Sequence, residues 1–125
     1  MTIREVIAQA KAYRQPGIPE ADMLQVINNV ELRAIREVIR PRAGEAEAFE
    51  PYTEADMGRE LMIPAPYDRV YVHAINAEND DRENQIGNIS NERRYYEYDF
   101  GNYASWYTRT HEREKLRMRS DWYGI

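Results

Sequence analysis

The sequence predicts a mainly α-helical fold: a small bundle of about four helices, with a β-hairpin or extended flap as an insertion and a C-terminal arm. Three observations predict it. Apolar residues recur at every third or fourth position over most of the chain, which is the spacing of one buried helical face. Prolines interrupt this pattern between the periodic stretches. The length of 125 residues suffices for one domain with a modest core.

The longest periodic stretch covers residues 86 to 111 and predicts the central helix. Its apolar face, which also contains Arg93, is mostly aromatic. With two tyrosines from the preceding helix it gives a predicted core or interface seam: Tyr67, Tyr71, Tyr96, Phe100, Tyr103, Trp106 and Tyr107. The opposite face is polar or charged and includes Glu92 and Glu97, which we expect to be solvated. Another layer of protein must therefore cover the seam.

Two shorter helices are predicted before the insertion. Thr2 and Glu5 have the spacing of a capping box, which predicts a first helix that ends before Pro16. Pro19 suits the first turn of a second helix, which should run to about residue 40 because Pro41 follows.

The helical period is lost in residues 42 to 65, where we predict the hairpin or flap. Short strands fit residues 48 to 52 and 60 to 63, and a largely irregular loop is the open alternative. The acidic side chains of this segment are predicted to make lateral contacts between copies of the chain: Glu50, Glu54, Asp56 and Glu60. A solvated surface would explain the same run of charge.

A third helix is predicted after Pro64 and Pro66, and the polar residues 76 to 84 are predicted to form a turn before the central helix. The chain then divides into a helical domain, residues 1 to 111, and a docking arm, residues 112 to 125. A basic stem and an aromatic tip define the arm: Arg113, Lys115, Arg117, Arg119, Trp122, Tyr123 and Ile125. An arm folded back on its own domain is the alternative.

Composition argues against several classes of function. A net charge of −5 does not suit a protein whose main task is to grip a phosphate backbone. The chain has no cysteine, and His73 and His111 belong to no recognisable pair of metal ligands. We therefore predict no catalytic residue, metal or cofactor. No apolar run approaches the length of a membrane span, so we expect a soluble protein without membrane contact.

Two segments carry a resemblance to a known family. They are residues 61 to 71, with Pro-Ala-Pro-Tyr-Asp before a helix, and the aromatic series that ends in Thr-Arg-Thr-His at residues 108 to 111. Over residues 19 to 111 the chain resembles the head-tail connector (adaptor) proteins of tailed bacteriophages.

This resemblance implies a structural virion protein of the neck, made and assembled in the host cytoplasm. Such subunits form a dodecameric ring beneath the portal, which prolongs the DNA channel and presents a surface to the stopper or tail protein. The implied partners are therefore sister copies, the portal and the stopper or tail, with residues 113 to 125 reaching toward the portal. DNA would pass through the channel without specific binding.

The main alternative is a small helical regulatory or scaffold protein that binds nucleic acid or protein partners. Three arginines near the end of the second helix could supply the nucleic-acid contact: Arg33, Arg36 and Arg40. An enzyme subunit whose active site is completed by a partner is a further alternative, but no residue of the sequence supports it.

Overall fold

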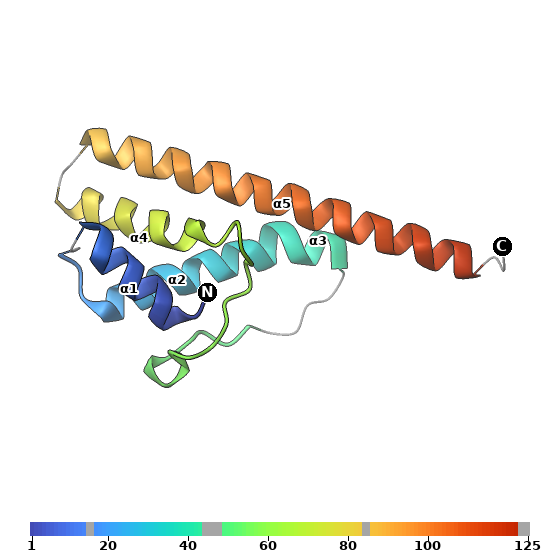
Figure 1. The fold of residues 1–125 in the computed structure, drawn as a ribbon, viewed down its shortest axis with the longest axis horizontal. Helices are drawn as coiled ribbons and strands as arrows, with labels where there is room; N and C mark the ends of the chain where they lie inside the picture. The colour runs from blue at the N-terminus through green and yellow to red at the C-terminus, as the bar shows by residue number, and fades with distance from the viewer. Residues whose placement is uncertain (15–16, 44–48, 84–85, 123–125) are drawn as a thin grey trace.

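The structure, a computed structural model, describes residues 1–14, 17–43, 49–83 and 86–122, with side chains for 1–12, 17–41, 49–83 and 89–111 (Figure 1). It is mainly helical, as the sequence predicts. The elements in chain order are α1 (Ile3–Arg14), α2 (Glu20–Ala34), the π-helical turn η1 (Ile35–Ile39), α3 (Arg40–Ala43), the 3-10 turn η2 (Glu54–Asp56), α4 (Arg69–Arg82) and α5 (Ile86–Trp122).

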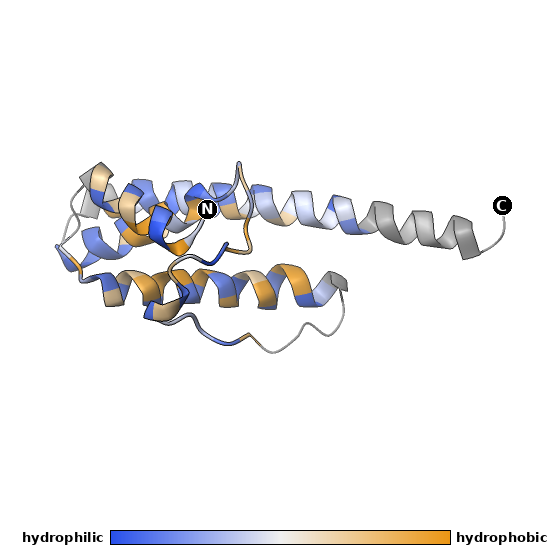
Figure 2. Cartoon of the chain, turned by 60° about the horizontal axis from the view of Figure 1, so that its bottom comes forward, coloured by the Kyte–Doolittle hydropathy of each residue, from blue (hydrophilic) through white to orange (hydrophobic). Residues whose placement is uncertain are grey.

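The helices form layers around one core. Helix α5 lies along α4, and α4 packs in turn on α1 and α2 (Figure 1). Figure 2 shows strong hydrophobic colour on α2 and a paler α5, because the inner face of α5 is built from tyrosines rather than aliphatic residues. The C-terminal end of α5 projects beyond the other helices (Figure 1).

The helix starts follow local rules. Thr2 Oγ1 accepts a hydrogen bond from the Glu5 amide at 3.2 Å, and the Thr2 amide donates to Glu5 Oε1 at 3.4 Å, which completes the predicted capping box.

Pro41, expected to close the second helix, instead lies inside α3. The wider π-helical turn precedes it, with the Arg40 amide bonded to the Ile35 carbonyl, and a proline is tolerated in the first turn of the helix that follows.

The predicted β-hairpin or flap is not found. Residues 49–65 contain no strand, and the single β-bridge of the described chain joins Thr2 to Glu60. The segment pairs with the N-terminus: the Leu61 amide donates to the Met1 carbonyl at 3.0 Å. Burial of Tyr52 and Leu61 holds it on the body. Two short strands paired only with each other are marginally stable. Pairing with the N-terminus and burial of Tyr52 and Leu61 therefore determine the path of this segment.

The predicted turn at residues 76 to 84 is also wrong, because α4 continues through Arg82. Polar residues of this stretch make hydrogen bonds within α4 and to neighbouring segments. Asn79 is buried and its Oδ1 accepts a hydrogen bond from the Gly17 amide at 2.7 Å. Arg82 donates to Asp22 at 2.6 Å and to Glu78 at 3.1 Å. These contacts stabilise a helical end that its composition alone does not favour.

Helix α5 is the predicted central helix, but it does not end at residue 111. Its backbone remains helical to Trp122, without a break at the boundary predicted between domain and arm. The division into residues 1 to 111 and 112 to 125 stays a prediction.

Candidate functional site

The predicted aromatic seam is assembled in the structure. Tyr71, Phe100 and Tyr103 are buried, and the other four members are partly buried against them. The ring centroid of Tyr67 lies 6.3 Å from that of Tyr103 and 5.9 Å from that of Trp106. Phe100 and Tyr103 are 6.3 Å apart. These are the separations of packed aromatic pairs, so the seam joins α5 to the start of α4 and to the turn that precedes it.

The seam ends in partly buried rings. Tyr107 lies 6.0 Å from Tyr103 and stacks on the His111 imidazole, with centroids 3.9 Å apart. Burial raises the pKa of Tyr103 to about 12, and the nearby Tyr107 and Glu31 act in the same direction. The Tyr103 hydroxyl therefore stays neutral at physiological pH, as its place in the core requires.

Two predicted positions on α5 are exchanged. Arg93, expected on the buried face, is exposed, and Glu92, expected in water, is buried. The Glu92 carboxylate lies 2.8 Å from His73 Nδ1. The imidazole of His73, on α4, is therefore the polar partner of this buried carboxylate. The other imidazole nitrogen, Nε2, lies 3.7 Å from Asp99 Oδ2. Burial raises the pKa of Asp99, against the lowering influence of His73 and Arg69.

Arg33 is held between α2 and α5. Its guanidinium makes two hydrogen bonds of 2.9 Å to the Glu97 carboxylate and one of 2.6 Å to Glu37. The same group lies 4.0 Å from the centre of the Phe100 ring and 5.2 Å from that of Tyr96. A bidentate ion pair and two cation–π contacts fix it in place.

A buried carboxylate that the sequence analysis missed lies at the centre of the molecule. Glu31 is fully buried, and three donors converge on it: the Tyr52 hydroxyl at 2.8 Å, the Met62 amide at 3.0 Å and the Tyr71 hydroxyl. Burial raises the pKa of the Glu31 carboxyl, although these hydrogen bonds act in the opposite direction. Burial, together with the Glu31 charge, also raises the pKa of Tyr52 and Tyr71. Glu31 thus joins α2, the irregular segment and α4.

A cavity of about 510 Å³ lies between α1 and α4. Its lining residues are Gln9, Ala12, Arg69, Val72, His73 and Asn76. Asn76 is buried, and neither its Nδ2 nor its Oδ1 has a hydrogen-bond partner among the described residues. An unpaired buried amide is costly, so Asn76 is a local weak point of the core.

The four acidic residues predicted as lateral contacts lie together around η2. Glu50, Glu54 and Glu60 are exposed, and Glu60 pairs with the N-terminal amine at 3.3 Å. Asp56 has a local role, because its carboxylate accepts the Thr53 amide at 2.8 Å in a capping box. Glu50 and Glu54 therefore remain the residues most open to a partner.

The side chains of the predicted docking arm lie outside the described residues, as does the backbone of Tyr123 and Ile125. Only the helical path of α5 to Trp122 is given for the arm. Within the described residues, no set of three or more His, Cys, Asp or Glu side chains is arranged to hold a metal ion. No helix in that part of the chain is long and apolar enough to cross a membrane.

Comparison of the chain with protein-family models, curated proteins and solved structures finds no match. The site described above consists of packed aromatic rings and paired charges. The aromatic rings contact one another, and the ionised groups are mostly paired within the subunit.

We expect Glu31→Gln to change how stability depends on pH. The folded-state pKa of Glu31 is raised above the ordinary 4.5, so its contribution to stability is fully present below pH 4.5 and is lost as the pH rises through the folded-state value. The variant lacks this loss. The free energy of unfolding of Glu31→Gln, minus that of the wild type, should therefore increase above pH 4.5, by about 1.4 kcal/mol for each pH unit between the two pKa values.

Denaturant titrations at several pH values measure this difference directly. Glu50→Gln, at an exposed glutamate, is the control and should follow the wild type. A difference between Glu31→Gln and wild type that stays constant from pH 4 to 8 would show that the buried carboxyl titrates normally.

We expect Arg33→Gln to lower the free energy of unfolding by about 1 to 2 kcal/mol, because the cation–π contacts and the bidentate pair with Glu97 are both lost. Arg36→Gln is the matched control: Arg36 is exposed in the adjoining turn, and its loss should change stability by less than about 0.5 kcal/mol. Equal effects in urea denaturation would contradict the assigned role of Arg33.

Asn76 and Asn79 allow a matched comparison within one helix. We expect Asn76→Leu to raise the free energy of unfolding by about 1 kcal/mol, since a buried amide without partners is replaced by an apolar group of similar shape. Asn79→Leu should destabilise, because it leaves the Gly17 amide without its acceptor. Thermal and denaturant unfolding measure both. Destabilisation by Asn76→Leu would show that the amide has a partner in solution.

Proposed function

We propose that this chain is a structural subunit of the head-tail connector of a tailed bacteriophage. In this role, copies of the chain form a ring in the virion neck, between the portal and the tail or stopper protein, and extend the DNA channel. The observation that carries the proposal is the contact between the two segments on which the family resemblance rests.

These segments form one packing unit. The Pro-Ala-Pro-Tyr stretch begins after Ile63, which is buried and whose amide donates to the Tyr71 hydroxyl at 3.0 Å. This positions Tyr67 against Tyr103 and Trp106 of the aromatic series. Since the two segments depend on each other physically, their joint presence is better explained by a shared architecture than by two chance similarities in composition.

The shape of α5 also supports the proposal. It is the longest helix, and its C-terminal end extends past the body of the subunit (Figure 1). A helix that leaves its own domain suits a component that must reach a second protein. Five residues of the predicted docking arm fall within this helix: Arg113, Lys115, Arg117, Arg119 and Trp122.

The charge distribution favours a channel component over a nucleic-acid-binding regulator. The net charge is −5, and a ring through which DNA slides should not grip phosphates. Arg33, one of the three arginines on which the regulator alternative depends, is engaged by Glu97 and Glu37 within the subunit. Arg36 and Arg40 are exposed, but two arginines on an acidic domain make a small site for nucleic acid.

Electron microscopy with a truncated chain tests the proposal. We expect the full-length protein to form rings at the portal of DNA-filled heads. A chain that lacks residues 113–125 should remain folded, because the core lies in the earlier residues, but should no longer join the heads. Circular dichroism and thermal unfolding establish that the truncated form is folded.

Two results would count against the proposal. One is the absence of rings when the full-length protein is mixed with portal-bearing heads. The other is a salt-sensitive shift of DNA in a gel at low protein concentration, which would favour the regulatory alternative. Retained head binding by the truncated chain would remove the docking role from the arm.

A further inference from the structure

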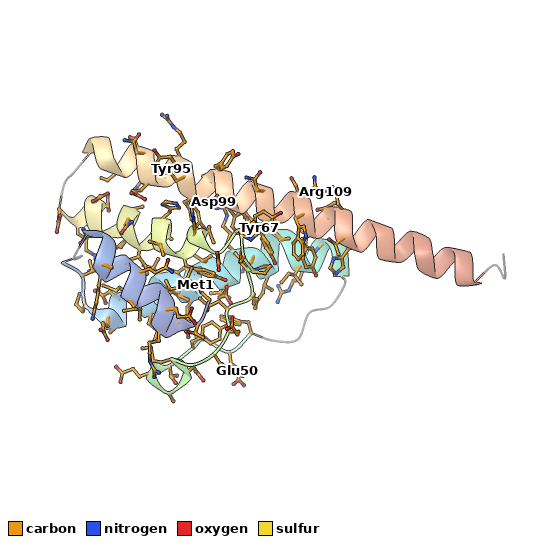
Figure 3. All side chains as sticks on the ribbon, viewed as in Figure 1. Met1, Glu50, Tyr67, Tyr95, Asp99 and Arg109 are labelled. Carbon is orange, nitrogen blue, oxygen red and sulfur yellow. The ribbon has the colours of Figure 1, made fainter. Side chains whose placement is uncertain are left out.

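The outer face of α5 is a surface that neither the seam nor the docking arm uses. Residues on this face recur at helical spacing and are all exposed: Asn91, Arg94, Tyr95, Tyr98, Gly101, Asn102, Ser105 and Arg109. Figure 3 labels Tyr95 and Arg109, which lie toward opposite ends of this stretch. We call these eight residues the outer face.

Two tyrosines of the outer face are open to solvent. Tyr95 is 50% exposed and Tyr98 is 69% exposed, and they are the large apolar side chains that stand out as exposed in the described chain. Tyrosine is enriched at protein interfaces, because it buries a large ring while its hydroxyl stays hydrogen-bonded. Two exposed tyrosines within one helical turn form a candidate anchor for a partner.

The outer face is positively charged. It carries Arg94 and Arg109 and no carboxylate, and neither arginine forms an ion pair with another described residue. Three carboxylates of α5 within residues 89–111 point elsewhere: Glu92 toward His73, Glu97 toward Arg33 and Asp99 toward His73. The internal pairing therefore leaves a basic strip on an acidic protein.

Gly101 lies in the middle of the outer face. A Cβ at this position would meet no atom within 4 Å, so the fold of the subunit does not require glycine there. Glycine is a poor helix former, and its presence in the interior of α5 calls for a reason outside the subunit. A missing side chain beside Tyr98 leaves room for a neighbouring chain to approach the helix closely.

A complementary surface lies on the other side of the same chain. Glu50 and Glu54 are exposed near η2, and neither is ion-paired with another described residue. Figure 1 shows the η2 segment and α5 on opposite sides of the body, and Figure 3 labels Glu50 on the η2 side. A ring needs two different faces on each subunit, because a head-to-tail contact closes only by repetition.

We infer that the outer face of α5 docks against residues 50–60 of a second copy of this chain. Arg94 and Arg109 face Glu50 and Glu54 of the neighbour, and Tyr98 packs at the centre of the contact beside Gly101. The inference rests on the proposed function, since it specifies which surfaces join adjacent subunits in the ring.

Charge reversal tests the contact. We expect Arg94→Glu to weaken association between copies by about tenfold or more, because like charges then face each other. Glu54→Arg should have a similar effect, and the double variant should recover much of the loss. Arg36→Glu, a reversal at an exposed arginine outside the outer face, is the control. The measurements are sedimentation velocity over a range of concentrations and counts of rings on portal-bearing heads.

Tyr98→Ala and Gly101→Gln provide a second test that does not depend on charge. Both positions are exposed, so the variants should fold, and Gly101→Gln should be more stable than wild type as a subunit. We expect both to weaken association. A stabilised subunit that associates less well separates a role between copies from a role within one copy.

The outcomes distinguish this inference from the proposed function. If wild-type rings form on heads and the variants form them equally well, the inference is wrong and the connector role stands. If rings form but Arg94→Glu and Tyr98→Ala lose only the tail or stopper, the outer face binds that protein, and the inference is likewise wrong. If the wild type forms no rings, alone or on heads, both fail.

Discussion

The buried carboxylate of Glu31 is the constraint on which the arrangement of the chain depends. An ionisable group in a core needs donors, and here they come from Tyr52, the Met62 amide and Tyr71. Asn28, three residues earlier on α2, bonds the Tyr52 backbone at both its amide, 2.8 Å, and its carbonyl, 3.2 Å. A segment with almost no secondary structure is thereby fixed to α2 at two residues, Tyr52 and Met62. This placement determines where the chain enters α4, and so where Tyr67 meets the aromatic rings of α5.

Internal ion pairs also determine which charges of α5 face the solvent. Helix α5 carries several carboxylates, and its inner and lateral ones pair with groups on other elements: Glu92 with His73 and Glu97 with Arg33. These pairs join α5 to α4 and α2 and leave arginines on the side that faces away. The positive outer face is thus a consequence of how the helix is bound to its own subunit.

Periodicity predicted the helices and the seam, because both follow from spacing along the chain. The same spacing also places two glutamates, Glu31 and Glu92, on apolar faces. Glu31 lies in register with Leu24, Ile27 and Val38, and a carboxylate within an apolar stripe indicates a buried polar group. Glu92 lies in the same way between Ile89 and Tyr96. The path of residues 49–65 was less accessible, since its partners are the N-terminus and Glu31, far away in sequence. Helix α4 continues through a polar stretch because of long-range bonds to Gly17 and Asp22, which no local pattern reveals.

Glu31 also links the interior to the proposed ring. Of the acidic residues around η2, Glu54, Asp56 and Glu60 lie between Tyr52 and Met62, and Glu50 lies two residues before Tyr52. Tyr52 and Met62 both bond to Glu31. Tyr71, the third partner, lies on α4, which packs along α5. One buried carboxylate therefore fixes the acidic segment relative to the helix that carries the outer face. In a closed ring, the angle between these two surfaces sets the number of subunits, because each contact must repeat without accumulating error. A rigid internal hydrogen-bonded centre meets this requirement better than a flexible loop held by surface contacts, since movement of the acidic segment would alter the angle at every interface at once.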